Sequence, residues 1–246
     1  MNKTAKAKMN KYGFTSAADI EIKPRLILSI SGLEKQGKTH FALTAPGPIA
    51  VFSTDIGEEG VVSKFTEEKD VYIMKIDRID EDSAEQAPAE FSRFRDAYRQ
   101  MLRGNEVRTI MFDTATEIWE ILRMARFGRL TQVMPYQYGP VNAEYRALIR
   151  DAYAYDKNLI LLHKMKSRYI NDKRTGEYDR AGFSDTGFLV QVNTRVYRYS
   201  PEDGGEFAIY IDDCRQNPDL AGEELAGPLC SFNFLAGSVM PDVNWG

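Results

Sequence analysis

Cysteine and histidine are scarce in this 246-residue chain, which contains two of each. Cys214 and Cys230 do not have the spacing of a zinc site, and His40 and His163 lie far from them in the sequence. The sequence therefore predicts no zinc centre. A disulfide between the two cysteines stays open, but so few cysteines favour a reducing compartment.

Long apolar segments are also missing. No apolar run approaches the roughly 20 residues of a membrane-spanning helix. The N-terminal residues, MNKTAKAKMNKYG, contain lysines but are not followed by the apolar stretch of a secretory signal. Together with the low cysteine content, these absences predict a soluble, cytoplasmic protein that has no contact with a membrane.

An excess of positive charge is absent as well. The chain has 32 Lys and Arg against 36 Asp and Glu, which gives a formal net charge of −4. Any contact with DNA must therefore come from local basic patches, because the charge of the whole molecule does not attract a polyanion. The remaining composition, 43% hydrophobic and 28% charged, is that of an ordinary globular protein.

From Pro24 onward, short β-rich runs alternate with helical patterns. RLILSIS (25–31) is expected to form a buried strand of a parallel sheet. Further strands are expected at PIAVFSTD (48–55), VYIMKID (71–77), RTIMFD (108–113) and NLILLH (158–163). Helices are expected at about 38–43, from 88 to 102, after 113 and at 141–152.

The pattern changes after residue 163. A polar loop is expected first, and then strands only, at FLVQVNTRVYRYS (188–200), EFAIYIDD (206–213) and SFNFLAG (231–237). This order predicts an α/β fold with a mostly parallel sheet and a C-terminal antiparallel β extension. We expect residues 1–22 to be a flexible arm, residues 23–240 a single domain and residues 241–246 a short tail.

One stretch carries a specific chemical signal. It fits G-x-x-x-x-G-K-[ST] in full and consists of Gly32, Leu33, Glu34, Lys35, Gln36, Gly37, Lys38 and Thr39. In such a loop, backbone N–H groups surround phosphate oxygens, and the N-terminus of the following helix adds its positive dipole. Lys38 is expected to contact the β and γ phosphates and the Thr39 hydroxyl to bind Mg²⁺. For His40, a place on the helix surface is favoured over contact with the nucleotide.

Two further expected strands end in a carboxylate. Asp113 is expected to hold Mg²⁺ together with Thr39, and its alternative role is that of a helix N-cap. Asp55 would lie at the same edge, because parallel strands open toward one edge of a sheet. There it could orient or deprotonate a water that attacks the γ-phosphate, with Glu58, Glu59 or no catalytic role as alternatives.

His163 ends another expected strand, where a polar side chain can sense the γ-phosphate. The segment after it interleaves cations with aromatic rings, and the residues expected to contact single-stranded DNA are Lys164, Lys166, Arg168, Tyr169, Lys173 and Arg174. Three acidic residues in and just after this segment, at 172, 177 and 179, dilute its positive charge, and a solvated loop is the alternative. A second such segment, 123–138, is equally well explained as a helix surface followed by an aromatic-packed loop.

With these motifs the chain resembles the RecA-like P-loop ATPases, and in particular the compact phage-encoded AAA-type or Sak-type single-strand annealing proteins. The resemblance spans about residues 24 to 238. Its motifs are GLEKQGKT, with a glutamate at the third position as in RecA-type loops, APGPIAVFSTD, IMFDTAT, LLHKMK and DDCRQNP. It implies a three-layer RecA-like fold with helices on both faces of the sheet, and ATP with Mg²⁺ bound between subunits.

The resemblance also implies roles for single residues. Lys38, Asp55, Asp113 and His163 match the catalytic positions, with Asp55 standing where the family more often has glutamate. Arg215 matches the finger that reaches the nucleotide of a neighbouring subunit, although the lysine that usually precedes it is absent.

The implied function is ATP hydrolysis coupled to single-stranded DNA during phage recombination, by annealing or by strand exchange. The partners implied are further copies of the chain, in a ring or filament, and a phage or host single-strand binding protein in the host cytoplasm. The alternatives are a nucleotide-gated DNA-binding or oligomerisation module with negligible turnover, a helicase-like ATPase and a kinase.

Overall fold

The computed structural model describes residues 9–55, 59–129 and 132–245. Its centre is an eight-stranded sheet with the strand order β10-β9-β8-β1-β5-β4-β2-β3. The strands are β1 (Ile27–Ser31), β2 (Ile49–Ser53), β3 (Val71–Lys75), β4 (Thr109–Asp113), β5 (Asn158–His163), β8 (Val192–Arg198), β9 (Phe207–Cys214) and β10 (Glu224–Ala226). All strands from β8 to β3 run parallel, whereas β9 and β10 add to β8 as antiparallel strands.

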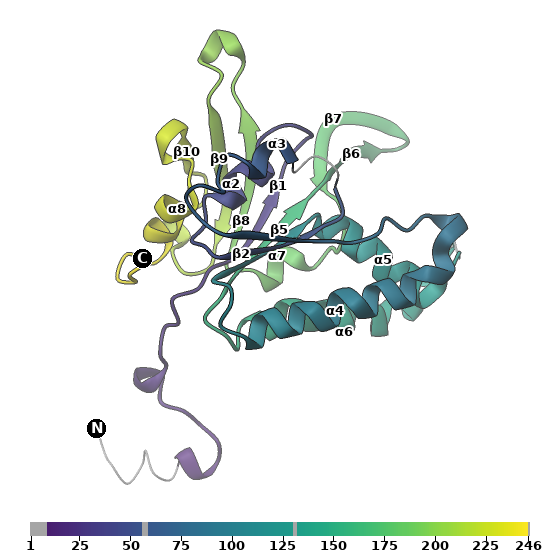
Figure 1. Cartoon of the computed structure of the whole chain (residues 1–246), viewed down its shortest axis with the longest axis horizontal. Helices are drawn as coiled ribbons and strands as arrows, with labels where there is room; N and C mark the ends of the chain where they lie inside the picture. The colour runs from purple at the N-terminus through teal and green to yellow at the C-terminus, as the bar shows by residue number, and fades with distance from the viewer. Residues whose placement is uncertain (1–8, 56–58, 130–131, 246) are drawn as a thin grey trace.

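Helices cover both faces of this sheet (Figure 1). One face carries α4 (Ala87–Arg103), α5 (Ala115–Phe127) and α6 (Tyr138–Ala152), and the other carries α2 (Lys38–Leu43) and α8 (Phe232–Val239). Two four-residue helices, α3 (Glu59–Val62) and α7 (Thr186–Leu189), lie in the connections. The three-layer RecA-like α/β fold with a C-terminal antiparallel extension is therefore confirmed.

The central strands form because their apolar residues can be buried on both sides. Every residue of β1, β2, β4 and β5 is buried, as expected for strands enclosed between two helical layers. Phe52 on β2 and Phe112 on β4 pack edge to face with each other and with α4, where their rings meet Phe94 and Tyr98 at centroid distances of 5.0–6.2 Å. The parallel register brings the carboxyl ends of these four strands to the same edge of the sheet.

Three local expectations were wrong. Residues 231–237 form helix α8, not a strand, because Ser231 caps the helix and its apolar residues recur at helical spacing. The segment after β5 is not a loop but a two-stranded hairpin, β6 (Met165–Ile170) and β7 (Lys173–Arg180), whose turn residues Asn171 and Asp172 both have positive φ. Phe188 and Leu189 belong to helix α7, so the strand expected from residue 188 begins only at Val192.

Residues 9–22 extend away from the sheet and its helices (Figure 1). Cys214 and Cys230 are both free thiols. Within the described ranges, no helix combines the length and the apolar character needed to cross a membrane.

Candidate functional site

The expected phosphate loop connects β1 to α2, and its two glycines are needed for close packing. A Cβ atom at Gly32 would lie 2.7 Å from the carbonyl oxygen of Val196 on β8. Gly37 has a φ of 92°, and a Cβ there would lie 2.6 Å from the ring of Phe207 on β9. The loop therefore keeps its shape by lying against β8 and β9, and only glycine allows this approach at both positions.

Lys38, the first residue of α2, folds its side chain back into this loop. Its Nζ donates to the carbonyl oxygens of Gly32, at 2.9 Å, and of Leu33, at 2.7 Å. Burial lowers the pKa of Lys38, while the nearby carboxylates of Asp113, Asp55 and Glu34 act in the opposite direction. An ammonium group thus lies inside the loop, where a bound phosphate would find its closest cation.

Thr39 and Asp113 meet directly behind the loop. The Thr39 hydroxyl donates to Oδ2 of Asp113 at 2.8 Å, and Asp113 is 3% exposed at the end of β4. Asp113 is not the N-cap of α5, because that position belongs to Thr114, whose hydroxyl accepts from the backbone N–H of Glu117. The alternative role considered for Asp113 is therefore wrong.

The chemistry of this pair suits Mg²⁺. A hydroxyl and a carboxylate are the oxygen ligands that a P-loop site offers to the metal, which takes its other ligands from phosphates and water. No group of three or more His, Cys, Asp or Glu side chains in the described part of the chain is placed to hold a metal by itself. Thr39 and Asp113 would hold Mg²⁺ only together with a nucleotide.

The family model described as an AAA domain matches residues 25–187, which is more than half of the chain. This chain belongs to the AAA-domain family. No curated protein matches its sequence. The matched range contains the phosphate loop, the Thr39–Asp113 pair and the hairpin, so the chain is a nucleotide-binding P-loop ATPase of the AAA type.

Asp55 follows β2 at the same edge of the AAA domain. Ser53, at the end of β2, is the register partner of Asp113 on β4, and the Ser53 hydroxyl donates to the backbone oxygen of Asp55 at 3.1 Å. Asp55 is exposed and close enough to Lys38 to affect its pKa. Glu58 lies outside the described residues, and only the backbone of Glu59 is described. The role of Asp55 as catalytic base stays a prediction.

His163 is enclosed at the end of β5, beside Ser31 of β1. Its Nδ1 lies 3.2 Å from the carbonyl oxygen of Ala181, and its buried Nε2 has no hydrogen-bond partner among the described residues. Burial, assisted by the guanidinium of Arg180, lowers the pKa of His163 to about 3. The imidazole is therefore neutral at physiological pH, between the strand that leads to the phosphate loop and the end of the hairpin.

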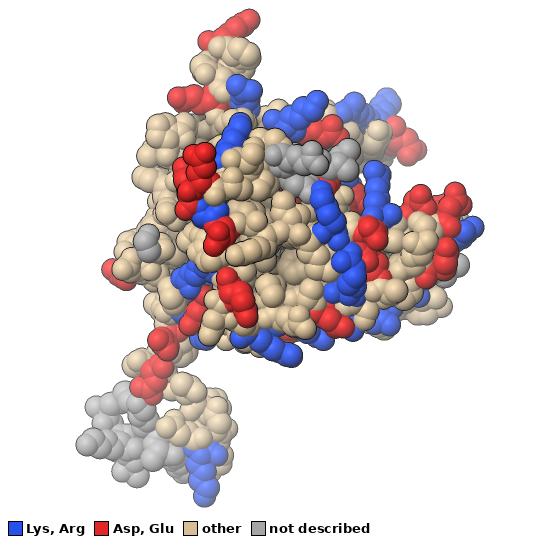
Figure 2. Space-filling view, in the orientation of Figure 1, with Lys and Arg blue, Asp and Glu red and all other residues tan. Residues whose placement is uncertain are grey.

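The six residues expected to contact DNA all lie at or on the hairpin, but two of them are in ion pairs. Lys164 pairs with Glu117 of α5, and Arg168 pairs with Glu177 and Asp179 of β7. Lys166 and Lys173 form no ion pair with any described residue. The guanidinium of Arg174 lies over the ring of Tyr178, and Tyr169 is 63% exposed near the tip. Figure 2 shows Lys and Arg side chains gathered over the hairpin with acidic ones between them.

In the second basic segment, the described residues 123–129 and 132–138 form the end of α5 and part of the connection to α6. Arg123 pairs with Glu120 and lies over the ring of Tyr138, and Arg126 pairs with Glu144 of α6. These contacts favour the interpretation of this segment as helix surface and packed loop.

Arg215 does not join the nucleotide site of its own subunit. β9 runs antiparallel to β8, so its first residue, Phe207, lies against the phosphate loop at the carboxyl ends of the parallel strands. Its last residue, Cys214, therefore lies near the amino ends of those strands. At that far edge Arg215 donates from Nη2 to the carbonyl oxygen of Phe188 at 2.5 Å. A role toward the nucleotide of a neighbouring subunit stays a prediction.

Two cavities lie beside the phosphate loop, and both are lined in part by residues that were not predicted to belong to a site. The smaller one, of about 280 Å³, is lined by Gly37, His40, Phe207, Pro228 and Cys230, among others. The His40 ring stacks on Phe207, with centroids 5.9 Å apart and an interplanar angle of 13°. Burial raises the pKa of the Cys230 thiol to about 11, which keeps it protonated and apolar.

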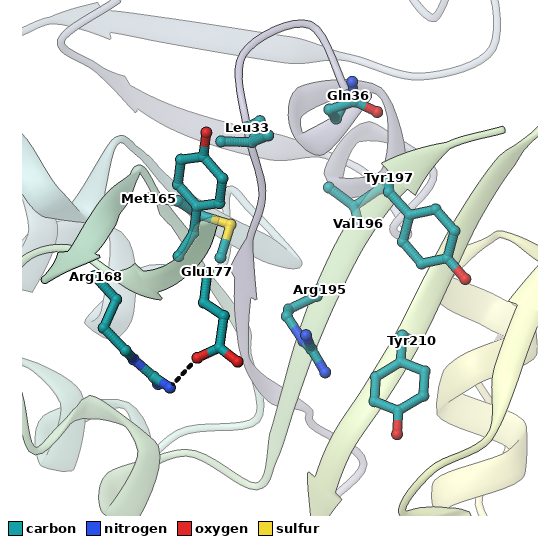
Figure 3. Close-up of a pocket in the computed structure, with 10 residues that line it drawn as sticks. Leu33, Gln36, Met165, Arg168, Glu177, Arg195, Val196, Tyr197 and Tyr210 are labelled. Atoms are coloured by element: carbon teal, nitrogen blue, oxygen red, sulfur yellow. Dashed lines mark hydrogen bonds and ion pairs between the residues drawn. The ribbon is translucent and has the colours of Figure 1, made fainter. Parts of the chain in front are cut away.

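The larger cavity, of about 820 Å³, lies between the phosphate loop, the hairpin and β8 (Figure 3). Leu33 and Met165 line it on one side, and Tyr197 and Tyr210 on the other, with Arg195 between them. Arg195 is held by Asp212 at 2.7 Å and lies over the Tyr210 ring, 4.8 Å from its centroid. The hairpin and the nucleotide loop therefore share one open cavity.

Proposed function

We propose that this AAA-type ATPase acts on single-stranded DNA, as do the phage Sak-type annealing proteins that it resembles, with ATP hydrolysis coupled to DNA binding at the hairpin. The observation that carries this proposal is the attachment of the hairpin, which is tied at both of its ends to the elements that surround the nucleotide.

The first end is tied to the helix that follows Asp113. The backbone N–H of Lys164 donates to Oγ1 of Thr116 at 3.0 Å, and its ammonium pairs with Glu117. Both partners lie in the first turn of α5. A shift of Asp113 on nucleotide binding would therefore move the first turn of α5, and with it Lys164 at the start of the hairpin.

The second end is tied to the strand that leads into the phosphate loop. Nη1 of Arg180, the last residue of β7, donates to the hydroxyl of Ser29 on β1 at 3.2 Å and to Oδ1 of Asn193 on β8 at 2.9 Å. Burial lowers the pKa of Arg180, and Asp213 and Asp212 oppose this effect. The partly buried guanidinium therefore connects the last residue of the hairpin to β1 and β8.

The part of the hairpin that faces solvent has the chemistry of a single-strand site. Without Arg180, residues 164–179 contain five Lys and Arg against three Asp and Glu, in a chain whose net charge is −4. Tyr169 and Ile170 at the tip are 63% and 59% exposed. Cations that contact phosphates, next to rings that stack on bases, bind single strands without sequence preference.

Single-stranded DNA is expected to raise the ATP turnover of the unchanged protein. Lys166→Gln with Lys173→Gln should weaken DNA binding about tenfold or more at low salt and lower the slope of log affinity against log salt by about 1.4, because two phosphate contacts are lost. Basal turnover should not change. The measurements are a DNA titration by fluorescence anisotropy at several salt concentrations and an ATPase assay with and without DNA.

A matched control removes two exposed cations elsewhere. Arg103→Gln with Arg150→Gln, on α4 and α6, changes the net charge equally and should leave both the affinity and its salt slope unchanged. An ATP turnover that does not respond to single-stranded DNA, together with no DNA binding in the presence of nucleotide, would refute the proposed function.

We also propose that the smaller cavity receives the nucleotide base. It adjoins Gly37 and the first turn of α2, so a triphosphate held by the loop could place its base against the Phe207 ring. Phe207→Ala is expected to weaken ATP binding about 10- to 100-fold, because stacking on an aromatic ring contributes about 1–3 kcal/mol. Calorimetric titration with ATP and with inorganic triphosphate, both with Mg²⁺, tests this assignment.

The triphosphate distinguishes base stacking from support of the loop. Inorganic triphosphate has no base, so its affinity should be the same in Phe207→Ala and in the unchanged protein. If both ligands lose affinity equally, Phe207 acts by holding Gly37 in place and not by contacting the base.

We propose that several copies of the chain form a ring or filament on DNA, in which Arg215 of one copy would approach the nucleotide of the next. Its position at the far edge of the sheet, away from its own phosphate loop, supports a contact of this kind.

A further inference from the structure

The smaller cavity beside the phosphate loop is lined by one charged side chain, that of Glu206. The other described residues that line it are glycines, apolar residues, His40 and Cys230. Burial lowers the pKa of His40, with Lys64 acting in the same direction, and burial raises the pKa of the Cys230 thiol to about 11. Both groups are therefore uncharged at physiological pH. Among the described residues, Glu206 alone brings a charge to this cavity.

The fold gives the Glu206 carboxylate a defined place at the cavity wall. Glu206 directly precedes Phe207, the first residue of β9, and its carbonyl oxygen accepts from the backbone N–H of Tyr199 at 2.9 Å. Gly227, which has a φ of 56°, lies against the carboxylate. A Cβ atom at Gly227 would lie 2.9 Å from Oε2 and 3.1 Å from Oε1 of Glu206. Glycine at this position therefore leaves the space that the carboxylate occupies.

The hydrogen-bonding capacity of this carboxylate is not used within the subunit. Glu206 forms no ion pair and no side-chain hydrogen bond with any residue that the structure describes. The neighbouring cation, Arg198, donates from Nε to the carbonyl oxygen of Gly205 at 2.7 Å, and its guanidinium lies over the Phe207 ring. An ionised carboxylate only accepts hydrogen bonds, so a ligand that contacts Glu206 in this cavity must supply an N–H or O–H donor.

The bases of nucleotides differ in what they present to such an acceptor. Adenine carries an amine at position 6 of the purine ring, which donates, whereas guanine carries an oxygen there, which accepts. A base held against Phe207 would turn its edge toward the cavity wall, where Glu206 lies. A site that forms a hydrogen bond with an amine of its ligand discriminates against an analogue that lacks this amine.

We propose that Glu206 selects adenine by accepting a hydrogen bond from the 6-amine of the base that lies on Phe207. Glu206 is then a specificity-determining residue and not a catalytic one, because the base is at the opposite end of ATP from the γ-phosphate. The inference rests on the proposed placement of the base in the smaller cavity. It adds the group that distinguishes one purine from another.

A nucleotide that lacks only the amine tests this contact. Purine riboside 5′-triphosphate has a hydrogen where ATP has the 6-amine and is otherwise identical to it. Calorimetric titration in the presence of Mg²⁺ gives the affinity of the unchanged protein and of Glu206→Ala for both nucleotides. We expect the unchanged protein to bind ATP about tenfold more tightly than the analogue, because a charged acceptor strengthens the hydrogen bond. In Glu206→Ala, this ratio should fall to about one.

The ratio of the two affinities separates recognition of the amine from support of the fold. A change in the shape of the loop or in the charge near the triphosphate alters both affinities alike and leaves their ratio unchanged. Glu206→Gln keeps one acceptor oxygen without the charge and should give an intermediate ratio. Glu202→Ala removes an exposed carboxylate from the same β8–β9 connection, four residues earlier, and should keep the tenfold ratio.

Three results would overturn the inference: a ratio near one in the unchanged protein, a tenfold ratio that persists in Glu206→Ala, or tighter binding of GTP than of ATP. Failure of the base placement itself has a different sign, because Phe207→Ala would then weaken ATP and inorganic triphosphate equally, and this inference would fall with it. If Phe207→Ala weakens ATP alone while Glu206→Ala leaves the ratio unchanged, the base lies in the cavity and Glu206 does not select it.

Discussion

Lys38→Ala is expected to raise the dissociation constant for Mg²⁺–ATP about 100-fold or more. The Lys38 ammonium lies within the loop, with Nζ 2.9 and 2.7 Å from two carbonyl oxygens, and no other side chain of the motif is a cation in this position. Charge-assisted hydrogen bonds to phosphate contribute about 1.5–3 kcal/mol each, so losing more than one of them accounts for this magnitude. Titration with a fluorescent ATP analogue measures the change.

Lys35→Ala is the matched control for this prediction. It removes one lysine from the same loop, three residues earlier, where the side chain is not drawn into the loop by the bonds that hold Lys38. We expect its affinity for ATP to stay within about threefold of that of the unchanged protein, since an exposed charge is screened by salt. Equal, small effects of the two substitutions would show that the loop does not grip a triphosphate through Lys38.

The central sheet could be predicted from sequence because its signals are local. Runs such as RLILSIS and NLILLH are mostly apolar without alternating charged residues, which is typical of strands covered on both sides. The phosphate loop was equally clear, because its glycines, lysine and threonine recur at fixed spacing between a strand and a helix. Thr39 and Asp113 are 74 residues apart, and their contact followed from the rule that parallel strands open toward one edge.

The errors arose where distant parts of the chain decide the structure. The strand expected from residue 188 begins only at Val192, and it joins the parallel part of the sheet because it lies beside β1, more than 160 residues away. Phe207 was missed for the same reason, since only the folded sheet brings β9 against Gly37. Arg180 lies in the segment that was expected to be a polar loop, whereas the structure partly buries its guanidinium against Ser29 and Asn193.

The hairpin is a different case, because its signals were present in the sequence. Two polar residues, Asn171 and Asp172, separate two segments that both contain β-favouring residues, and this is the pattern of a tight β-turn. The density of charge in residues 164–180 hid that pattern. The same charges explain why the hairpin is only moderately basic, because the acidic residues of β7 pair with Arg168 across the two strands.

The choice between an ATPase and a nucleotide-gated module depends on Asp55. Asp55→Asn is expected to lower the turnover number for ATP about 10²- to 10⁴-fold, which is the contribution of a positioned general base. ATP should bind as tightly as before or more tightly, because the substitution removes a negative charge near Lys38, where the triphosphate would lie. Single-turnover hydrolysis and analogue binding, measured on the same protein, test both parts.

Glu58→Gln and Glu59→Gln are the matched controls, since each neutralises one carboxylate a few residues further along the chain. If Asp55 is the base, both controls keep nearly normal turnover, and only Asp55→Asn loses it. If substitution of one of the glutamates abolishes turnover while Asp55→Asn keeps it, that glutamate is the base and Asp55 is not. If the unchanged protein hydrolyses ATP no faster than Asp55→Asn does, yet binds DNA only with ATP, then nucleotide binding alone controls the hairpin through Thr116 and Ser29.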